Sequence, residues 1–488
     1  MVMIEGETMN QKLNIDNTYL TLPSILYSKM EPKKDHTNTM DILNTKLAQE
    51  IGISPLFLES PEGIQFLSGG TSLSGGPFAE AYCGHQYGHF TMLGDGRAMI
   101  IGEQVYNNKR IDLHLKGSGR TPYSRGGDGK ATLKSMLREY LISEAMHHLK
   151  VPTSRSLAVL KTNEFIQREQ MNQGAILVRT ATSHIRVGTF EYARALQQPR
   201  VLEELADYTI VRHFPQLTNH DDKYLEFFKA VIDNQAQLIA KWQSIGFVHG
   251  VLNTDNVLVS GETIDYGPCA FLDHYDPSIT FSSIDRNSRY SYKNQPVITS
   301  WNLSKLASAL LPLIDSDEKT AISKLNQELT VFETKYNEYY MKEMAKKLGI
   351  QNPKSDDLEL VNELLSLMEV HQLDFTNTFY VLTTQQYDAL SIPLVQRTLW
   401  LERWQNRIVE DGTMEDAIRI MKQSNPVVIP RNHLVDEALI QASFEHDAQL
   451  FYTLLELYQD PFNYDKELLE IYRTPQKSDK RFVTYCGT

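Results

Sequence analysis

The chain contains 488 residues, a length that exceeds what one hydrophobic core usually supports. Its composition, 41% hydrophobic and 22% charged, is ordinary for a globular protein. Its formal net charge of -13 argues against nucleic acid and anionic lipid as partners, because both bind proteins with an excess of Lys and Arg. Three cysteines are too few for a disulfide framework, and the sequence has no apolar run of about 18 residues and no N-terminal secretory signal. We therefore expect a cytoplasmic protein with no membrane partner and no nucleic-acid partner.

The first part of the chain predicts a sheet followed by a helix. Residues 1–65 mix polar turns with short apolar runs, and we expect them to wrap the first lobe without taking part in chemistry. Glycine is then frequent between residues 67 and 130, with strand-like runs at 98–101 and 111–115, which predicts a twisted sheet with tight loops. Apolar residues recur at helical spacing over 132–149, so a helix should follow.

The rest of the chain adds a few strands and then becomes helical. We expect helices over 225–243 and over most of the chain after residue 300, and short strands at 175–178, 247–248, 256–259 and 263–264. A small β-rich lobe thus precedes a larger, mainly helical lobe, which is an α+β arrangement. We predict a β-rich lobe at 66–190, a helical lobe at 191–476 and a polar tail at 477–488.

Two glycine-containing loops in the β-rich lobe are candidates for contacting phosphate. The segment from Gly94 through Gly96 and Arg97 lies between strand candidates, where glycine lets backbone N–H groups approach an anion closely. Asp128 and Gly129 occupy a second such loop. In isolation, a hairpin turn supplied by Asp-Gly is the favoured explanation of the first loop, and Asp128 could likewise be only a turn residue.

Lys116 ends the strand candidate at 111–115, where an ammonium group could meet phosphate oxygens or a carboxylate. The following helix offers two acidic partners, Glu139 and Glu144, and a Lys–Glu pair of this kind fixes the lysine in kinase-like enzymes. Glu144 falls inside the apolar stripe of the helix and Glu139 lies off it, so helical periodicity leaves the choice open. A solvated lysine at a strand end is the alternative.

Arg179 and Arg186 follow the strand candidate at 175–178, and their planar guanidinium groups suit recognition of a polyphosphate. Either arginine alone is equally consistent with an ordinary surface position. Searches for other enzyme motifs find no P-loop, no zincin motif and no hydrolase elbow. The cluster at 83–89 offers three metal ligands without a fourth, which favours a structural loop.

The segment 249–256 and the later Asp265-Tyr266-Gly267 parallel the catalytic loop and the magnesium-binding segment of protein kinases. Val251 occupies the position of the kinase catalytic aspartate, which disfavours ordinary phosphotransfer. An aspartate reappears at Asp255, directly before Asn256, and Asn256 and Asp265 carry the hard oxygen ligands that Mg²⁺ prefers. An Asx turn is the alternative explanation of residues 253–256.

The order of these motifs resembles the selenoprotein O family, and the resemblance extends from about residue 60 to the end of the chain. It is carried by four segments, 82–88, 115–125, 253–256 and 264–268. The resemblance implies a protein-kinase-like fold of two lobes that binds ATP in a flipped orientation. It further implies transfer of AMP to Ser, Thr or Tyr hydroxyls of protein substrates, with UMP transfer from UTP as a related activity.

The resemblance also implies roles for individual residues. It pairs Lys116 with Glu139 and assigns the phosphates and the rest of the nucleotide to Arg179, Arg186, Asp128, Gly129, Gly94, Gly96 and Arg97. It makes Asp255 the proton acceptor and Asn256 and Asp265 the ligands of Mg²⁺ or Mn²⁺. By the same resemblance, Cys486 near the C-terminus would pair with Cys269 in a redox switch. A conventional protein kinase and an ATP-binding pseudokinase scaffold are the alternatives to be tested.

Overall fold

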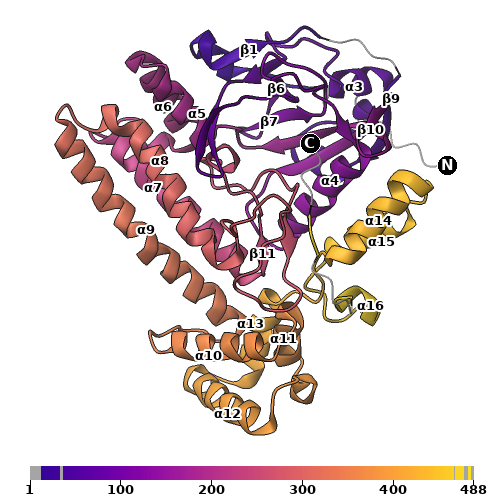
Figure 1. Cartoon of the computed structure of the whole chain (residues 1–488), viewed down its shortest axis with the longest axis vertical. Coiled ribbons are helices and arrows are strands. Elements are labelled where there is room, and N and C mark those ends of the chain that lie inside the picture. The colour runs from indigo at the N-terminus through magenta and orange to yellow at the C-terminus, as the bar shows by residue number, and fades with distance from the viewer. Residues whose placement is uncertain (1–12, 33–36, 467, 477–481, 485–488) are drawn as a thin grey trace.

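The computed structural model describes residues 13–32, 37–466, 468–476 and 482–484. An antiparallel sheet of eight strands fills the upper part of Figure 1, and long helices extend below it. The strand order is β1-β3-β6-β7-β10-β9-β2, with β8 paired to β10. Its members are β1 (Tyr27–Lys29), β2 (Thr39–Leu43), β3 (Phe78–Glu80), β6 (Ala98–Tyr106), β7 (Lys109–Lys116), β8 (Ala131–Thr132), β9 (Arg155–Gln167) and β10 (Met171–Ala181).

The two faces of this sheet are covered by different helices, because side chains alternate between the faces along each strand. Leu113 and Leu115 of β7 and Ile176 of β10 belong to one apolar cluster, with the short helices α1 (Thr45–Glu50), α2 (Pro55–Leu58) and α3 (Pro61–Leu67). Leu177 of β10 belongs to another, with α4 (Leu133–His148). The alternate residues of β7, including Lys116, therefore share the face of the sheet on which α4 packs.

The second part of the described chain is mainly helical. Two small antiparallel sheets of two strands lie outside the main sheet, the hairpin of β4 (Cys83–Gln86) and β5 (His89–Met92) and the pair of β11 (Phe247–Val248) and β12 (Ala270–Phe271). The helices are α5 (Val187–Ala195), α6 (Pro199–His213), α7 (Lys223–Ser244), α8 (Gln295–Ile314), α9 (Glu318–Lys347), α10 (Asp357–Val370), α11 (Phe375–Thr383), α12 (Leu394–Asp411), α13 (Met414–Ser424), α14 (Asn432–Ile440), α15 (Gln449–Tyr458) and α16 (Glu470–Arg473). In Figure 1, α10 to α13 form a group at the end farthest from the sheet.

Most predicted elements are confirmed, including the strands at 98–101, 111–115 and 175–178 and the helices at 132–149 and 225–243. The strands expected at 256–259 and 263–264 are wrong. Residues 254–256 form a 3-10 turn, and the remainder makes only isolated bridges, from Leu258 to Arg186 and from Thr263 to Thr153. The apolar residues of this stretch are buried, and Leu258 and Ile264 form a small cluster with Ala181 of β10, but the stretch makes isolated bridges instead of a ladder.

One helical segment of the described residues, Tyr292–Ile314, is long and apolar enough by composition to cross a membrane. It includes α8, which packs against α5, α7 and α9. Its polar residues Thr299 and Asn302 are fully buried, and the Asn302 amide donates to the carbonyl of Leu252 at 3.0 Å. These polar residues of α8 therefore lie within the protein core, where Asn302 supports the loop that carries Asp255, and 39% of the apolar window of this segment is buried.

Candidate functional site

A cavity of about 370 Å³ lies between the paired ends of strands β6 and β7, at Ala98 and Lys116, and the loops at 251–256 and 265–268. Every residue expected to bind nucleotide or metal or to accept the proton lines this cavity, except Glu139. Glu139 instead accepts a hydrogen bond from Lys116 Nζ. The cavity thus brings together Gly94, Gly96, Arg97, Lys116, Asp128, Gly129, Arg179, Arg186, Asp255, Asn256 and Asp265. These residues are spread over 172 positions of the chain, so only the fold makes them neighbours.

Lys116 and Arg179 share the same two carboxylates. Lys116 Nζ lies 2.6 Å from Glu139 Oε2 and also contacts Asp265 Oδ1, and Arg179 Nη1 lies 3.0 Å from Glu139 Oε1 and 2.8 Å from Asp265 Oδ1. Glu144 is used elsewhere, because it binds Arg155 Nη2 at 2.7 Å. The pairing of Lys116 with Glu139 is therefore confirmed, and the choice that periodicity left open is decided.

Asp265 is the carboxylate on which three cations converge. Its backbone has φ of +64°, a left-handed conformation that non-glycine residues adopt at a cost, and Arg186 Nη1 lies 3.7 Å from its Oδ2. Burial by itself would raise the pKa of Asp265, but the charges of Lys116, Arg179 and Arg186 outweigh it and hold the pKa well below its ordinary value. Asp265 is therefore ionised and suited to holding a cation.

Arg186 occupies the N-cap position of α5 and is 2% exposed. Its Nη1 donates to the backbone carbonyl of Asp255 at 2.7 Å, and its guanidinium lies 4.4 Å above the ring of Tyr82. These contacts orient the guanidinium before any ligand binds, which limits the entropy lost on binding. Arg186 therefore fixes the Asp255 loop and faces the cavity at the same time.

Asp255 lies in the 3-10 turn and is 8% exposed. Within the described chain its Oδ1 has no hydrogen-bond partner, and a Cβ on Gly84 would lie 2.2 Å from that oxygen, so only glycine fits beside it. Burial raises the pKa of Asp255 to about 6, although the charge of Arg186 opposes the shift. A buried carboxyl whose pKa lies this close to neutrality is suited to general base catalysis.

Asn256 and Asp265 are the two candidate ligands for a metal ion in this cavity. The Asn256 amide nitrogen donates to the carbonyl of Val251 at 2.9 Å, which leaves the amide oxygen as the group available for a cation. Together with the ionised Asp265 carboxylate, this gives two hard oxygen donors, which fit Mg²⁺ or Mn²⁺. The described residues contain no cluster of three His, Cys, Asp or Glu side chains with metal-site geometry. The chemistry of this donor set suits an ion that takes its remaining ligands from phosphate and water.

The two glycine loops differ in what their residues contact. Asp128 forms a double hydrogen bond with Arg168, at 2.8 and 3.0 Å, and this bond, with some opposing burial, lowers the pKa of Asp128 to about 2. Asp128 thus orders its own loop. A Cβ on Gly129 would lie 2.2 Å from the carbonyl oxygen of Gly119, and one on Gly94 would lie 2.5 Å from the ring of Tyr123. Arg168, which lines the cavity from the β9–β10 turn, is a site residue that the sequence analysis missed.

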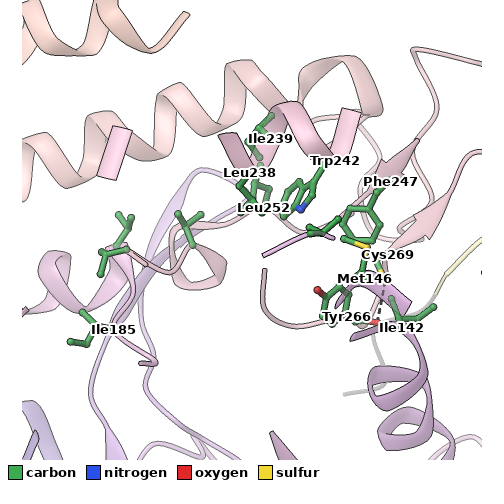
Figure 2. Packing of buried hydrophobic residues seen from close by; sticks show 14 of the residues in the cluster. Ile142, Met146, Ile185, Leu238, Ile239, Trp242, Phe247, Leu252, Tyr266 and Cys269 are labelled. Carbon is green, nitrogen blue, oxygen red and sulfur yellow. Dashed lines mark hydrogen bonds between the residues drawn. The ribbon is translucent and has the colours of Figure 1, made fainter. Parts of the chain in front are cut away.

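The segment that carries His249 and Asp255 rests on a core shared by α4 and α7. Figure 2 shows Trp242 of α7 beside Phe247, and Cys269 and Tyr266 beside Ile142 of α4. Trp242 also donates through Nε1 to Thr263 Oγ1 at 3.0 Å and stacks on His249. This packing on α4 and α7 fixes the positions of the two segments that carry Asp255 and Asp265.

Cys269 is a buried free thiol in the described chain, and burial raises its pKa to about 11. Cys486 lies outside the described residues, and so does the predicted Cys269–Cys486 pair. The described end of the tail reaches the same region, because the Thr484 hydroxyl donates to the carbonyl of Pro268 at 2.7 Å. The redox switch stays a prediction.

Comparison with known proteins supports the resemblance read from the motifs. The model of the family described as "Protein adenylyltransferase SelO" matches residues 9–459. The chain is 49% identical over 479 residues to protein nucleotidyltransferase YdiU of Clostridium perfringens (strain 13 / Type A), covering 97% of this chain and 98% of that protein. It is 48% identical over 485 residues to the YdiU protein of Brevibacillus brevis, covering 99% of both. The YdiU protein of Halalkalibacterium halodurans is 48% identical over 480 residues. The chain therefore belongs to the protein adenylyltransferase SelO family of nucleotidyltransferases.

Proposed function

We propose that this protein transfers AMP from ATP to Ser, Thr or Tyr hydroxyls of protein substrates, and that UTP serves as an alternative donor of UMP. The observation that carries the proposal is the single cavity in which Lys116, Arg179 and Arg186 face Asp255 and Asp265. Three cations suit a triphosphate, and a buried carboxylate suits activation of a hydroxyl. The family supports a nucleotide substrate and a protein substrate.

The proposal includes a protein-kinase-like arrangement of two lobes. It is supported by the Lys116–Glu139 pair, which joins β7 to α4, and by the segment 249–256 with Asp265 on the opposite side of the cavity. Flipping the nucleotide would place the α-phosphate beside Asp255. We further place the protein in the cytoplasm, without a membrane or nucleic-acid partner, in keeping with its net charge of -13.

In this mechanism the cations neutralise the polyphosphate while the acceptor hydroxyl is deprotonated. Asp255, which lines the cavity, accepts the hydroxyl proton, and the hydroxyl oxygen attacks the α-phosphorus. One P–O bond forms to the acceptor and one breaks to release pyrophosphate, whose negative charge Lys116 and Arg179 stabilise. Asn256 and Asp265 would hold Mg²⁺ or Mn²⁺, which when bound supplies further charge neutralisation at the phosphates.

Nucleotides labelled on different phosphates separate this function from its two alternatives. With ATP labelled on the α-phosphate, label should enter protein acceptors, including peptides with Ser, Thr or Tyr, and Asp265→Ala should abolish it. Asp388→Ala is the matched control, because that side chain is 99% exposed and absent from the cavity lining. Transfer of γ-label instead would identify a conventional kinase. Thermal stabilisation by ATP without any transfer would identify a pseudokinase scaffold.

A further inference from the structure

A second cluster of cations lies beside the cavity, outside its lining, on the far side of the β4–β5 hairpin. It consists of Arg289, Trp301, Lys305, His85 and Phe90, and we call it the cationic platform. Arg289 lies 4.6 Å from the ring centroid of Trp301, and Lys305 Nζ lies 4.6 Å from the same ring. The ring centroid of His85 lies 5.3 Å from that of Trp301. The ring centroid of Phe90 lies 5.4 Å from that of His85.

His85 of the platform is paired with a carboxylate, because its Nδ1 lies 2.5 Å from Glu191 Oε1, but the two permanent cations are not. Neither Arg289 nor Lys305 has an Asp or Glu oxygen within ion-pair distance among the described residues, although the protein carries a net charge of -13. Arg289 Nε and Nη2 are buried and have no hydrogen-bond partner in the described chain. Buried guanidinium nitrogens ordinarily find acceptors, so this site has donors to offer to an anion.

The platform is joined to the Asp255 loop by direct hydrogen bonds. The backbone N–H of His85 donates to Thr254 Oγ1 at 2.7 Å, and that of Tyr87 donates to Asn253 Oδ1 at 3.1 Å. Tyr290, which follows Arg289, donates its hydroxyl to the same Asn253 oxygen. The platform and the loop are therefore fixed relative to each other.

The hairpin itself presents one face to each site. Along β4, Gly84 touches Asp255 and Gln86 lines the cavity, whereas His85 between them packs on Trp301. The partner strand β5 exposes two apolar side chains, Phe90 at 49% and Met92 at 52%. A polypeptide crossing this hairpin would therefore meet apolar contacts, the platform and Asp255 in sequence.

We propose that the cationic platform binds an acidic side chain of the protein acceptor and so presents a neighbouring hydroxyl to Asp255. The inference rests on the proposed function and adds to it a class of substrate, namely hydroxyl residues with an Asp or Glu nearby in the chain. Charge complementarity decides the occupant, because the one carboxylate at the platform, Glu191, is paired with His85, whereas Arg289 and Lys305 contact the Trp301 ring and have no ion-pair partner among the described residues. The planar Arg289 fork suits a carboxylate, and stacking on Trp301 keeps both cations in place.

The test compares tyrosine peptides that differ only in charge. The peptides have an alanine background, with Glu, Ala or Lys placed at successive positions on either side of one tyrosine, and transfer of α-label from ATP is measured. We expect Glu at one or more positions to raise kcat/KM about fivefold to tenfold over Ala, with KM for ATP unchanged. The preference should weaken as salt is added, because exposed charges are screened.

Variants of the platform decide whether it is the source of this preference. Lys305→Glu should reverse the preference toward Lys-containing peptides, and Arg289→Gln should weaken it, while both leave KM for ATP unchanged. Lys342→Glu is the matched control, since Lys342 lies 5.3 Å from the ring of Tyr339 on α9, outside the platform. The control variant should keep the wild-type preference.

The outcomes separate the platform from the proposed function. Label in peptides or in the enzyme itself without a preference for Glu would overturn the platform and leave the function standing. A preference for Glu that survives Lys305→Glu would also overturn the platform. If α-label enters neither peptides nor the enzyme under any condition, the proposed function fails, and the platform proposal fails with it.

Discussion

Two clusters of buried charge lie on strand β7, and they differ in how many cations share each carboxylate. Near one end of the strand, Arg212 contacts two carboxylates, Glu103 at 2.7 Å and Asp112 at 2.7 Å. At the other end, three cations share the one carboxylate of Asp265, whose side chain is 23% exposed and lines the cavity. Three cations that line one cavity mark a site for an anionic ligand, although Glu139 also pairs with two of them. A cation that is enclosed with two buried carboxylates, such as Arg212, stabilises the fold.

The largest expected effect is on the Arg212 cluster. Arg212→Met should lower the free energy of unfolding by about 3 to 5 kcal/mol, because Glu103 and Asp112 would stay buried without their main counterion. Urea unfolding measures the loss. Activity per folded molecule should change by no more than a few-fold, since Arg212 lies outside the cavity lining. A variant that keeps its stability but loses activity would break the comparison.

The corresponding substitution in the cavity cluster is Arg179→Met. Transfer of α-label should fall by about 10²- to 10³-fold, the usual loss when one donor to a developing charge is removed. The free energy of unfolding should change far less than for Arg212→Met, because Lys116 still pairs with both Glu139 and Asp265. Labelling assays and urea titrations on the same preparation test both statements. Equal destabilisation by the two substitutions would mean that both clusters are structural.

These two clusters also show what could be predicted from the sequence. The convergence of Lys116, Arg179 and Asp265 on one cavity could be predicted from motif order, because the motifs parallel those that surround the nucleotide in protein kinases. The partner of Lys116 could not be chosen by periodicity, since Glu139 and Glu144 are both buried, at 3% and 2% exposure. Helix α4 has the sheet on one side and α14 and α15 on another, so it has no single polar face.

Other features depend on long-range register and left no local signal. Arg168 reaches Asp128 across 40 positions only because the β9–β10 turn lies over the glycine loop. The apolar run at 256–259 looks like a strand, but its burial comes from packing, which includes Leu258 against Ala181 of β10, and the run makes an isolated bridge instead of a ladder. Composition and spacing report burial and do not report which element provides it.

A third prediction concerns pH and separates Asp255 from Asp265. Because Asp255 must be ionised to accept a proton and its pKa is about 6, kcat/KM should fall about tenfold per unit below pH 6 and level off above it. The pKa of Asp265 is lowered, so it should contribute no change in this range. Transfer measured from about pH 5 to 8 in buffers of constant ionic strength tests this. A flat profile would remove Asp255 as the base.

The same shift has the opposite sign for stability. The folded state raises the pKa of Asp255 above its unfolded value, so the stabilisation linked to this group is complete at low pH and is lost as pH rises through about 6. Asp255→Asn should therefore unfold at a higher temperature than the wild type above that pH, while losing the activity. A lower unfolding temperature would mean that the Asp255 carboxylate stabilises the fold, as the carboxylates around Arg212 do.

The smallest expected effect is at Arg168, because its ion pair with Asp128 is partly exposed to solvent. Arg168 and Asp128 have side chains 29% and 40% exposed, so solvent screens the pair and its loss should cost little stability. The pair orders the loop that contains Gly129, however, and a looser loop must be ordered again whenever nucleotide binds. Arg168→Ala and Asp128→Asn should therefore each raise KM for ATP about threefold with kcat nearly unchanged, and the double variant should be no worse than either single one. Additive effects of the two substitutions would show that Arg168 contacts the nucleotide independently of Asp128.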